Sequence, residues 1–191
     1  MIEFRKASDS DREQIAKCIA EAFKKDFASL SKDTQSVAAA IAGGIQTDRF
    51  YVAVDNKAIV GVLAISDCNG RSILTNAKSN RKHFGFVKGI IATIVLKEEF
   101  EKQLEYPSTV GYIEFVAVLE SYRRRGITSQ LLSYAMANEK YSQYKLDVTD
   151  VNQGAIACYR KYGFTEYERE KVKHAKQKGF SEKIYMSYEN K

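Results

Sequence analysis

Hydrophobic and polar positions in the first third of the chain alternate with the periods of helices and strands. Apolar residues three or four positions apart indicate a helix that packs on a core, whereas apolar residues at every second position indicate a half-buried strand. The pattern predicts, in order, a strand over residues 2–7, helices over 8–27 and 33–42, and a hairpin of strands 50–54 and 59–65. The sequence "DNK" supplies the hairpin turn.

The remainder of the chain continues this mixture after an irregular polar segment over residues 67–78. Pro107, the only proline, separates a predicted helix from a strongly β-forming stretch. We expect a helix over residues 89–104, a strand over 109–119, a helix with its apolar face from Ile127 to Met136, a strand over 144–150, a helix over 152–163, and strands over 164–170 and 182–189. A long basic loop over residues 171–183 joins the last two strands.

The order of these elements predicts the fold class. The strand–helix–strand succession after residue 109 favours a right-handed βαβ unit with two parallel strands, whereas the hairpins on either side favour antiparallel neighbours. We therefore expect an α/β fold of the α+β type, with a central mixed β-sheet that is mostly antiparallel, contains one parallel strand pair and carries helices on both faces. A length of 191 residues suits a single domain over residues 1–191.

Composition narrows the classes of partner. The net charge is +6, which suits a polyanionic ligand, but lysine and arginine are mixed with acidic residues throughout, so we expect no nucleic-acid partner. Three widely spaced cysteines and two histidines form no disulfide framework and no metal motif, so no metal is expected. With no signal peptide and no membrane-spanning run, we expect a cytoplasmic protein with no membrane contact. We expect the apolar stretch "GIIATIVL" (residues 89–96) to be buried or to form a dimer contact.

Three consecutive arginines, Arg123, Arg124 and Arg125, open the predicted helix in "ESYRRRGITSQLL" (residues 120–132). A helix N-terminus carries unpaired N–H donors and the positive end of the macrodipole, so cations are unfavourable there unless an anion lies among them. The turn follows a strand, where α/β sheets bind ligands, and Gly126 lets the backbone approach a phosphate closely. The pattern indicates an anion site, with a solvated charged turn as the alternative.

Two segments, "VAVLESYRRRGITSQLL" and "NQGAIACYRKYGF", resemble motifs of the GCN5-related N-acetyltransferase (GNAT) superfamily. The first motif, Q/R-x-x-G-x-G/A, matches residues 123–128 except at Thr128, whose hydroxyl can donate to a phosphate. The second motif is matched by Asn152, Ala155, Tyr159, Gly163 and Phe164. The resemblance implies that residues 1–108 hold the N-terminal strand, helices, hairpin and an insert. It also implies that residues 109–191 form an acetyl-CoA-binding core, with the parallel strand pair forming the crevice.

The resemblance further implies an acyl-CoA-dependent N-acyltransferase that uses acetyl-CoA as cosubstrate and needs no metal. It assigns the pantetheine arm to the strand residues Phe115, Val116, Ala117 and Val118. It assigns the pyrophosphate to the turn residues Arg123, Arg124, Arg125, Gly126, Ile127 and Thr128. Asn152 is expected to cap its helix and to bond the pantetheine, and an N–H near Val116 is expected to hold the oxyanion that forms during transfer.

Acetyl transfer to an amine needs a base and benefits from an acid. An alkyl amine has a pKa of about 10.4, so only about one in a thousand or fewer is unprotonated at neutral pH. Glu114, on the strand beside the thioester, is the candidate base, with a water chain as the alternative; a simple ion pair with a lysine is the other reading of Glu114. Regular alternation would point Glu114 and Val116 to the same face. By resemblance, Tyr159 is the acid that protonates the leaving thiolate, and core packing is its alternative role.

The acceptor amine cannot be identified from the residues. A protein lysine, an amino acid, a polyamine and an aminoglycoside all remain open, and so does formation of a homodimer. By resemblance, the acceptor enters opposite the CoA, near residues 23–30 and 171–183. The alternative to an enzyme is a non-catalytic acyl-CoA-binding or sensing module of the same fold, in which Glu114 or Tyr159 is idle.

Overall fold

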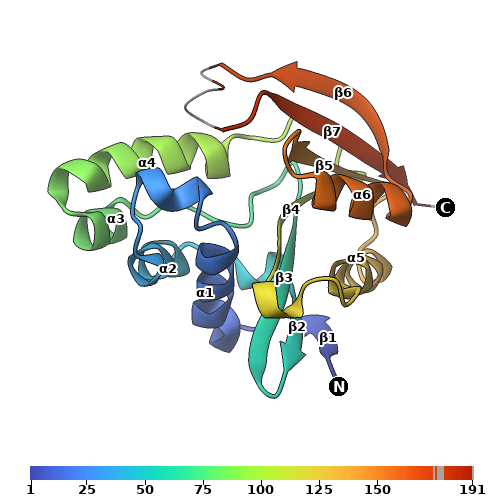
Figure 1. The fold of residues 1–191 in the computed structure, drawn as a ribbon, viewed down its shortest axis with the longest axis horizontal. Coiled ribbons are helices and arrows are strands. Elements are labelled where there is room, and N and C mark those ends of the chain that lie inside the picture. Colours follow the sequence, from blue (N-terminus) through green and yellow to red (C-terminus); the bar gives the residue numbers. More distant parts are fainter. Residues whose placement is uncertain (174, 176–178, 191) are drawn as a thin grey trace.

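A computed structural model places seven strands in one sheet, in the order β1-β2-β3-β4-β5-β7-β6 (Figure 1). The structure describes residues 1–173, 175 and 179–190. The strands are β1 (Glu3–Lys6), β2 (Phe50–Asp55), β3 (Ala58–Ser66), β4 (Val110–Val118), β5 (Gln143–Thr149), β6 (Thr165–Lys171) and β7 (Glu182–Glu189). The α-helices are α1 (Arg12–Ala22), α2 (Thr34–Ala42), α3 (Ala77–Phe84), α4 (Phe86–Glu101), α5 (Ile127–Ala137) and α6 (Gln153–Tyr162).

The sheet confirms the predicted fold class. Every neighbouring pair of strands is antiparallel except β4 and β5, which run parallel and are joined by α5. The turn between β2 and β3 has left-handed backbone at both Asn56 (φ 47°) and Lys57 (φ 67°), as the tight turns of two-residue hairpins require. The long basic loop predicted between β6 and β7 lies in part outside the described residues.

Two helical layers cover the sheet. Helices α1 to α4 lie on one side, and α5 and α6 lie on the other (Figure 1). The residues predicted for the apolar face of α5 are all buried, namely Ile127, Leu131, Leu132, Ala135 and Met136. They belong to one apolar cluster that also contains Tyr144, Leu146 and Met186 of β5 and β7, while α1 and α2 contribute Ile15, Ile19, Val37 and Ile41 to a second cluster on the opposite face.

Two predictions of helix limits were wrong, and one helix was not predicted. The helix expected over residues 8–27 is divided into the short 3-10 helix Asp9–Asp11, α1, and a second 3-10 helix Asp26–Ser29. Helix α3 was not predicted, because its sequence "AKSNRKHF" has almost no apolar residues; Asn80 is its only buried side chain. Gly85, with φ 82°, breaks the chain between α3 and α4, so α4 begins at Phe86 and ends at Glu101 instead of spanning residues 89–104.

Helix α4 is only partly buried, although its apolar sequence suggested burial as one possibility. Its inward face consists of the small residues Gly89 and Ala92 together with Leu96 and Phe100. A Cβ on Gly89 would lie 2.4 Å from the Arg81 Cα, so glycine is what allows α3 to pack closely against α4. Within the described residues, no helix combines the length and the apolar character needed to cross a bilayer.

Candidate functional site

The two parallel strands part in the middle of the sheet. β4 pairs with β5 only from Val110 to Tyr112, opposite residues Gln143 to Lys145. Both strands continue past this point, β4 to Val118 and β5 to Thr149, without pairing with each other. We call this region, residues 113–118 of β4 and 146–149 of β5, the β4–β5 split. It leaves one side of β4 without a ladder partner, and an extended chain can therefore pair there as an added strand.

A β-bulge lies in β4 at the split. Glu114 pairs with Ala64 and Ala117 pairs with Val62, so Phe115 and Val116 together face a single position of β3. Phe115 has φ 50°, a left-handed conformation that costs free energy for a residue with a bulky side chain. Such strained backbone persists where the surroundings hold it, and the bulge turns main-chain groups of β4 away from the regular ladder.

The bulge overturns the expectation that Glu114 and Val116 share a face. Val116 packs in the apolar cluster of α5 and α6, whereas Phe115 packs in the cluster of α1 and α2. Glu114 is paired with Ala64, which also belongs to the α1 and α2 cluster. The extra residue shifts the alternation by one position, so Glu114 and Phe115 lie on the same side and Val116 lies on the other.

The arginine turn lies between the end of β4 and the start of α5. Arg124 (φ 61°) and Gly126 (φ 75°) both have left-handed backbone, and Gly126 is the N-cap of α5 without a side-chain cap. Among the described residues no side chain caps the first-turn N–H groups of α5, and no acidic residue lies in that turn. This arrangement suits a bound anion, which is consistent with the predicted pyrophosphate position.

Two of the three arginine side chains are held at this turn. Arg123 Nε donates to the Val118 carbonyl at 3.2 Å, and Arg125 Nη2 donates to the Ser121 carbonyl at 2.9 Å. The Arg125 guanidinium also lies 4.9 Å from the centre of the Tyr122 ring. These contacts keep two positive charges beside the end of β4 and the start of α5.

Helix α6 brings Asn152 and Tyr159 to the other side of the split. Asn152 Oδ1 accepts a hydrogen bond from the Ala155 N–H at 3.2 Å, which confirms its predicted capping role, and Gly163 (φ 118°) ends the helix as expected. Tyr159 is 6% exposed and belongs to the same apolar cluster as Val116. Burial raises the pKa of the Tyr159 hydroxyl, so it is protonated at neutral pH.

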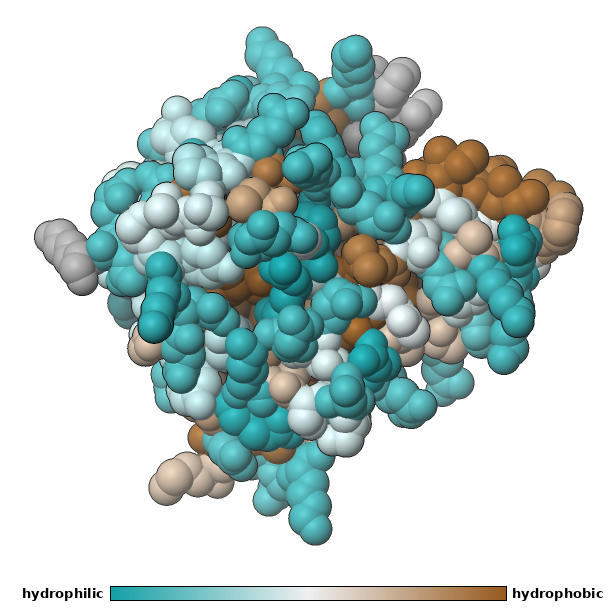
Figure 2. Space-filling model, turned by 180° about the vertical axis from the view of Figure 1, so that it is seen from behind, coloured by the Kyte–Doolittle hydropathy of each residue, from teal (hydrophilic) through white to brown (hydrophobic). Residues whose placement is uncertain are grey.

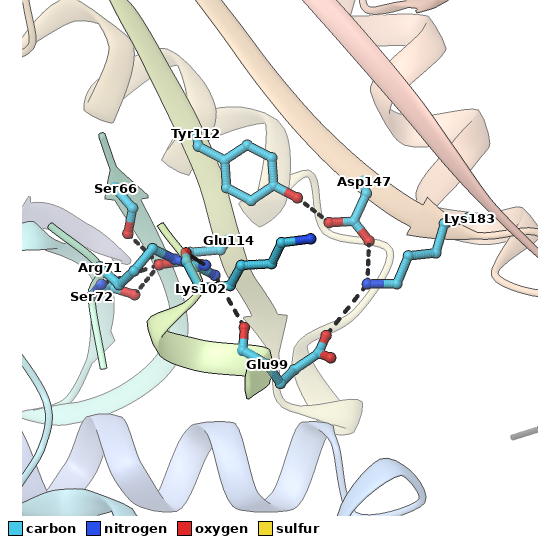
Figure 3. A network of polar contacts seen from close by, with 9 residues as sticks. All are labelled: Ser66, Arg71, Ser72, Glu99, Lys102, Tyr112, Glu114, Asp147 and Lys183. Carbon is cyan, nitrogen blue, oxygen red and sulfur yellow. Dashed lines mark hydrogen bonds and ion pairs between the residues drawn. The ribbon is translucent and has the colours of Figure 1, made fainter. Parts of the chain in front are cut away.

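Glu114 lies in a buried network of polar contacts (Figure 3). Its Oε2 accepts from Arg71 Nη2 at 2.5 Å and from Arg71 Nε at 3.2 Å. Its Oε1 accepts from the Ser66 hydroxyl, and from the Ser72 N–H at 3.2 Å and the Ser72 hydroxyl at 2.5 Å. Five donors meet a carboxylate that offers about four lone-pair sites. Glu114 therefore ties β4 to the segment that follows β3, and the predicted lysine partner is instead Arg71.

A second polar cluster lies next to this network on the same face of the sheet (Figure 3). The Tyr112 hydroxyl of β4 donates to Asp147 of β5. Lys183 Nζ lies 3.4 Å from Asp147 Oδ2 and 3.4 Å from Glu99 Oε1, between strand β7 and helix α4. Burial alone would lower the pKa of Lys183, but the charges of Asp147 and Glu99 outweigh it and raise that pKa.

The polar cluster around Asp147 and Lys183 was not predicted from the sequence, although the alternation of residues in β5 indicates part of it. In "YKLDVTD", the apolar residues Tyr144, Leu146 and Val148 are buried on the α5 and α6 side. The alternate positions Lys145 and Asp147 therefore point to the opposite face. Period-2 alternation thus identifies a polar face, but it does not show that β4, β7 and α4 meet there.

The segment over residues 23–30, predicted to contact the acceptor, lies beside the bulge. The Phe23 ring is 6.3 Å from the Phe115 ring in an edge-to-face arrangement, and Phe27 is buried against Phe100. The structure thus brings the end of α1, the bulge and the end of α4 together. The other segment predicted to contact the acceptor, over residues 171–183, lies partly outside the described residues, although Lys183 belongs to the polar cluster.

The sequence model of the acetyltransferase (GNAT) family matches residues 18–164. The chain is similar in structure to an N-acetyltransferase from Staphylococcus aureus Mu50 (TM-score 0.67, 16% identity, covering 97% of this chain and 100% of that chain). It is also similar to the ribosomal-protein-alanine N-acetyltransferase from Brucella melitensis (TM-score 0.62, 14% identity, 98% and 99% covered). The ribosomal-protein-S18-alanine N-acetyltransferase from Escherichia coli is a third such structure (TM-score 0.59, 15% identity, 99% and 94% covered). At these identities the likeness establishes the fold, and a search of curated proteins found no match.

Proposed function

The chain belongs to the acetyltransferase (GNAT) family, and we propose that it transfers the acetyl group of acetyl-CoA directly to a primary amine of a small molecule or a protein. The observation that carries this proposal is the β4–β5 split, with a β-bulge on one side, Tyr159 on the other and an uncapped, arginine-rich helix start at its end. When bound, acetyl-CoA supplies the acetyl group as a thioester.

The residues of the split fit the parts of acetyl-CoA. The side of β4 that has no ladder partner, over residues 115–118, suits the amides of the pantetheine arm. The first turn of α5 after Gly126 offers N–H donors to the pyrophosphate, and Arg123 and Arg125 neutralise its charge. Thr128, in the first turn of α5, adds a hydroxyl. In this proposal the strained backbone at Phe115 aims a main-chain N–H near Val116 at the developing oxyanion.

Tyr159 acts as the acid in this proposal. The hydroxyl holds its proton at neutral pH, and burial, which raises its pKa, favours transfer of that proton only to a strong base such as the thiolate that forms when the thioester breaks. Among the described residues the Tyr159 hydroxyl has no hydrogen-bond partner, so it is available to a bound substrate.

Glu114 and a water chain were the two candidates for the base, and the contacts of Glu114 favour the water chain. All lone pairs of its carboxylate are directed at Arg71, Ser66 and Ser72. We therefore assign Glu114 a positioning role, in which it fixes β4 directly before the bulge. We place the acceptor amine on the polar face next to it, beside Asp147 and Glu99, two carboxylates that share one cation, Lys183.

Release of free CoA thiol from acetyl-CoA, measured against a panel of primary amines, tests this function. We expect amine-dependent release that Tyr159→Phe lowers by about a hundredfold or more. The matched control is Tyr162→Phe, on the same helix, whose hydroxyl donates to the Ser133 Oγ at 3.3 Å; it should keep the activity. Saturable acetyl-CoA binding with no release for any amine would instead support a non-catalytic acyl-CoA-binding or sensing module.

The pH dependence of Glu114→Gln separates the two roles of that residue. If Glu114 only positions β4, the variant loses rate but keeps the acidic limb of the kcat/KM profile. Loss of that limb would identify Glu114 as the base and contradict our assignment.

A further inference from the structure

The outer face of α4 exposes six large apolar side chains. They are Phe86, Val87, Ile90, Ile91, Ile94 and Val95, and their exposed fractions range from 41% for Ile90 to 71% for Phe86. Figure 2 shows this apolar group as a brown projection at the edge of a largely hydrophilic surface. We call these six residues the α4 patch.

The α4 patch is ordered along the helix. Its members form two rows with a spacing of four residues, one through Phe86, Ile90 and Ile94 and the other through Val87, Ile91 and Val95. Residues four apart lie above one another on a helix, so the rows form one continuous stripe. The inward residues Gly89, Ala92 and Leu96 lie on the opposite side of the helix, so the face of α4 that packs on the core is separate from the α4 patch.

The α4 patch is as large as the largest apolar patches that monomers ordinarily expose. Six side chains of this kind expose on the order of 600 Å² together, at the upper end of the largest apolar patch on a typical monomer. A standard protein interface takes roughly 800 Å² from each partner, of which the centre is apolar and the rim is polar. The α4 patch thus has the area of the apolar centre of one such interface.

We propose that the α4 patch packs against the α4 patch of a second copy of this chain, with the two helices antiparallel about a twofold axis. The stripe is centred between Ile90 and Ile91, so the row through Ile90 of one copy meets the row through Ile91 of the other. The same operation carries Glu98 of one copy past the first turn of α4 of the other, to the end of that helix where α3 stops at Phe84 and Gly85 breaks the chain.

The charges at the two ends of the stripe complement each other in this arrangement. Helix α3 carries Arg81 and Lys82 in its last turn and has no acidic residue. Glu98 lies beyond the stripe in the last turns of α4. Within the part of the chain that the structure describes, none of these three side chains has an ion-pair partner. Because Arg81 packs against the inward face of α4 at Gly89, Lys82 is the cation that antiparallel packing brings toward Glu98 of the other copy.

Glu98 also favours a second copy over a lipid surface as the partner of the α4 patch. It follows Ile94 by four residues and Ile91 by seven, so it lies on the same line of the helix as the stripe. A membrane would have to accept this carboxylate at its interface, whereas a second copy offers Lys82.

Sedimentation velocity over a range of protein concentrations tests the proposal. We expect the wild type to approach twice the chain mass of 21.6 kDa. The double variant Ile91→Lys with Ile94→Lys should raise the dimer dissociation constant at least about a hundredfold, because it places charges in the apolar centre. The matched control is Val151→Lys, at an exposed apolar residue outside the patch, which should leave the dimer intact.

Charge reversal tests the antiparallel arrangement without touching the apolar residues. Glu98→Lys and Lys82→Glu should each weaken the dimer, and their combination should restore it. A wild type that stays monomeric at all concentrations would overturn the proposal, and so would a dimer unaffected by the patch variants. A monomer that floats with vesicles of phosphatidylcholine and phosphatidylglycerol would likewise overturn it and assign the patch to a membrane.

Discussion

Arg71→Leu removes the cation that faces Glu114 and leaves the carboxylate buried. The two side chains are only 11% and 8% exposed, so little water can replace the lost guanidinium. Ser66 and Ser72 still donate to Oε1, but Oε2 loses both of its donors. Arg71 also donates from Nη1 to the Lys102 carbonyl at 2.7 Å, so the substitution loosens the end of α4 as well.

The expected loss is about 3–5 kcal/mol of unfolding free energy, which is the usual cost of removing one partner of a buried ion pair. A domain is stable by roughly 5–15 kcal/mol in total, so this loss is a large fraction. For a chain of this length, each 1 kcal/mol corresponds to about 2–4 °C, and Tm should therefore fall by about 10 °C. Adding Glu114→Leu to Arg71→Leu should recover part of the loss, because no unpaired charge remains buried.

Urea unfolding followed by circular dichroism measures these differences. The matched control is Arg160→Leu, which breaks an ion pair of 3.3 Å with Glu166 at a site where the Arg160 side chain is 56% exposed. An exposed pair of this kind contributes up to about 1 kcal/mol. If Arg71→Leu costs no more than Arg160→Leu, Glu114 does not depend on its ion pair, and the positioning role assigned to it is refuted.

Three further predictions follow from other contacts. The pKa of Asp11 is lowered to about 2, mainly by its hydrogen bonds from Arg5, so its carboxylate stabilises the fold above about pH 4 and this stabilisation is lost as the pH falls toward 2. Asp11→Asn should therefore lower the free energy of unfolding by about 2 kcal/mol at pH 7 and by much less at pH 2, as measured by urea titration at both pH values. Cys18 is 2% exposed, and burial raises the pKa of its thiol to about 12. A thiol reagent at pH 8 should therefore label Cys18 only as fast as the protein unfolds, and rapid labelling detected by peptide mass mapping would contradict this. Asn152→Ala should cost about 1 kcal/mol through the lost cap and should also weaken acetyl-CoA binding in calorimetry; unchanged affinity would limit Asn152 to capping.

Most elements of the fold could be predicted because their local signals agree with their packing. The apolar face of α5 has helical spacing and is buried as expected, and Gly163 ends α6 where the motif places it. The mixed sheet follows from the order of strands and helices alone. These are features that neighbouring residues in the sequence decide.

The parts that escaped prediction depend on contacts between distant segments. Helix α3 has no apolar stripe and is held by close packing against Gly89 of α4. The order of apolar and polar residues in β4 does not indicate the bulge at Phe115, yet the bulge determines on which face of the sheet Glu114 lies. The partner of Glu114 lies forty-three positions earlier, at Arg71, in a segment whose irregular sequence predicted no structure. The motif positions therefore indicated where the split lies, whereas the arrangement of charged side chains around it could be seen only in the structure.

Isothermal titration calorimetry of the purified protein with acetyl-CoA tests the central claim most directly. The account predicts saturable binding at one site per chain with micromolar affinity, which Arg123→Ala weakens about tenfold or more and which Arg160→Ala, at an exposed side chain outside the arginine turn, leaves unchanged. Absence of saturable heat, or equal affinity in the wild type and Arg123→Ala, would contradict the assignment of the β4–β5 split and the arginine turn as the acetyl-CoA site.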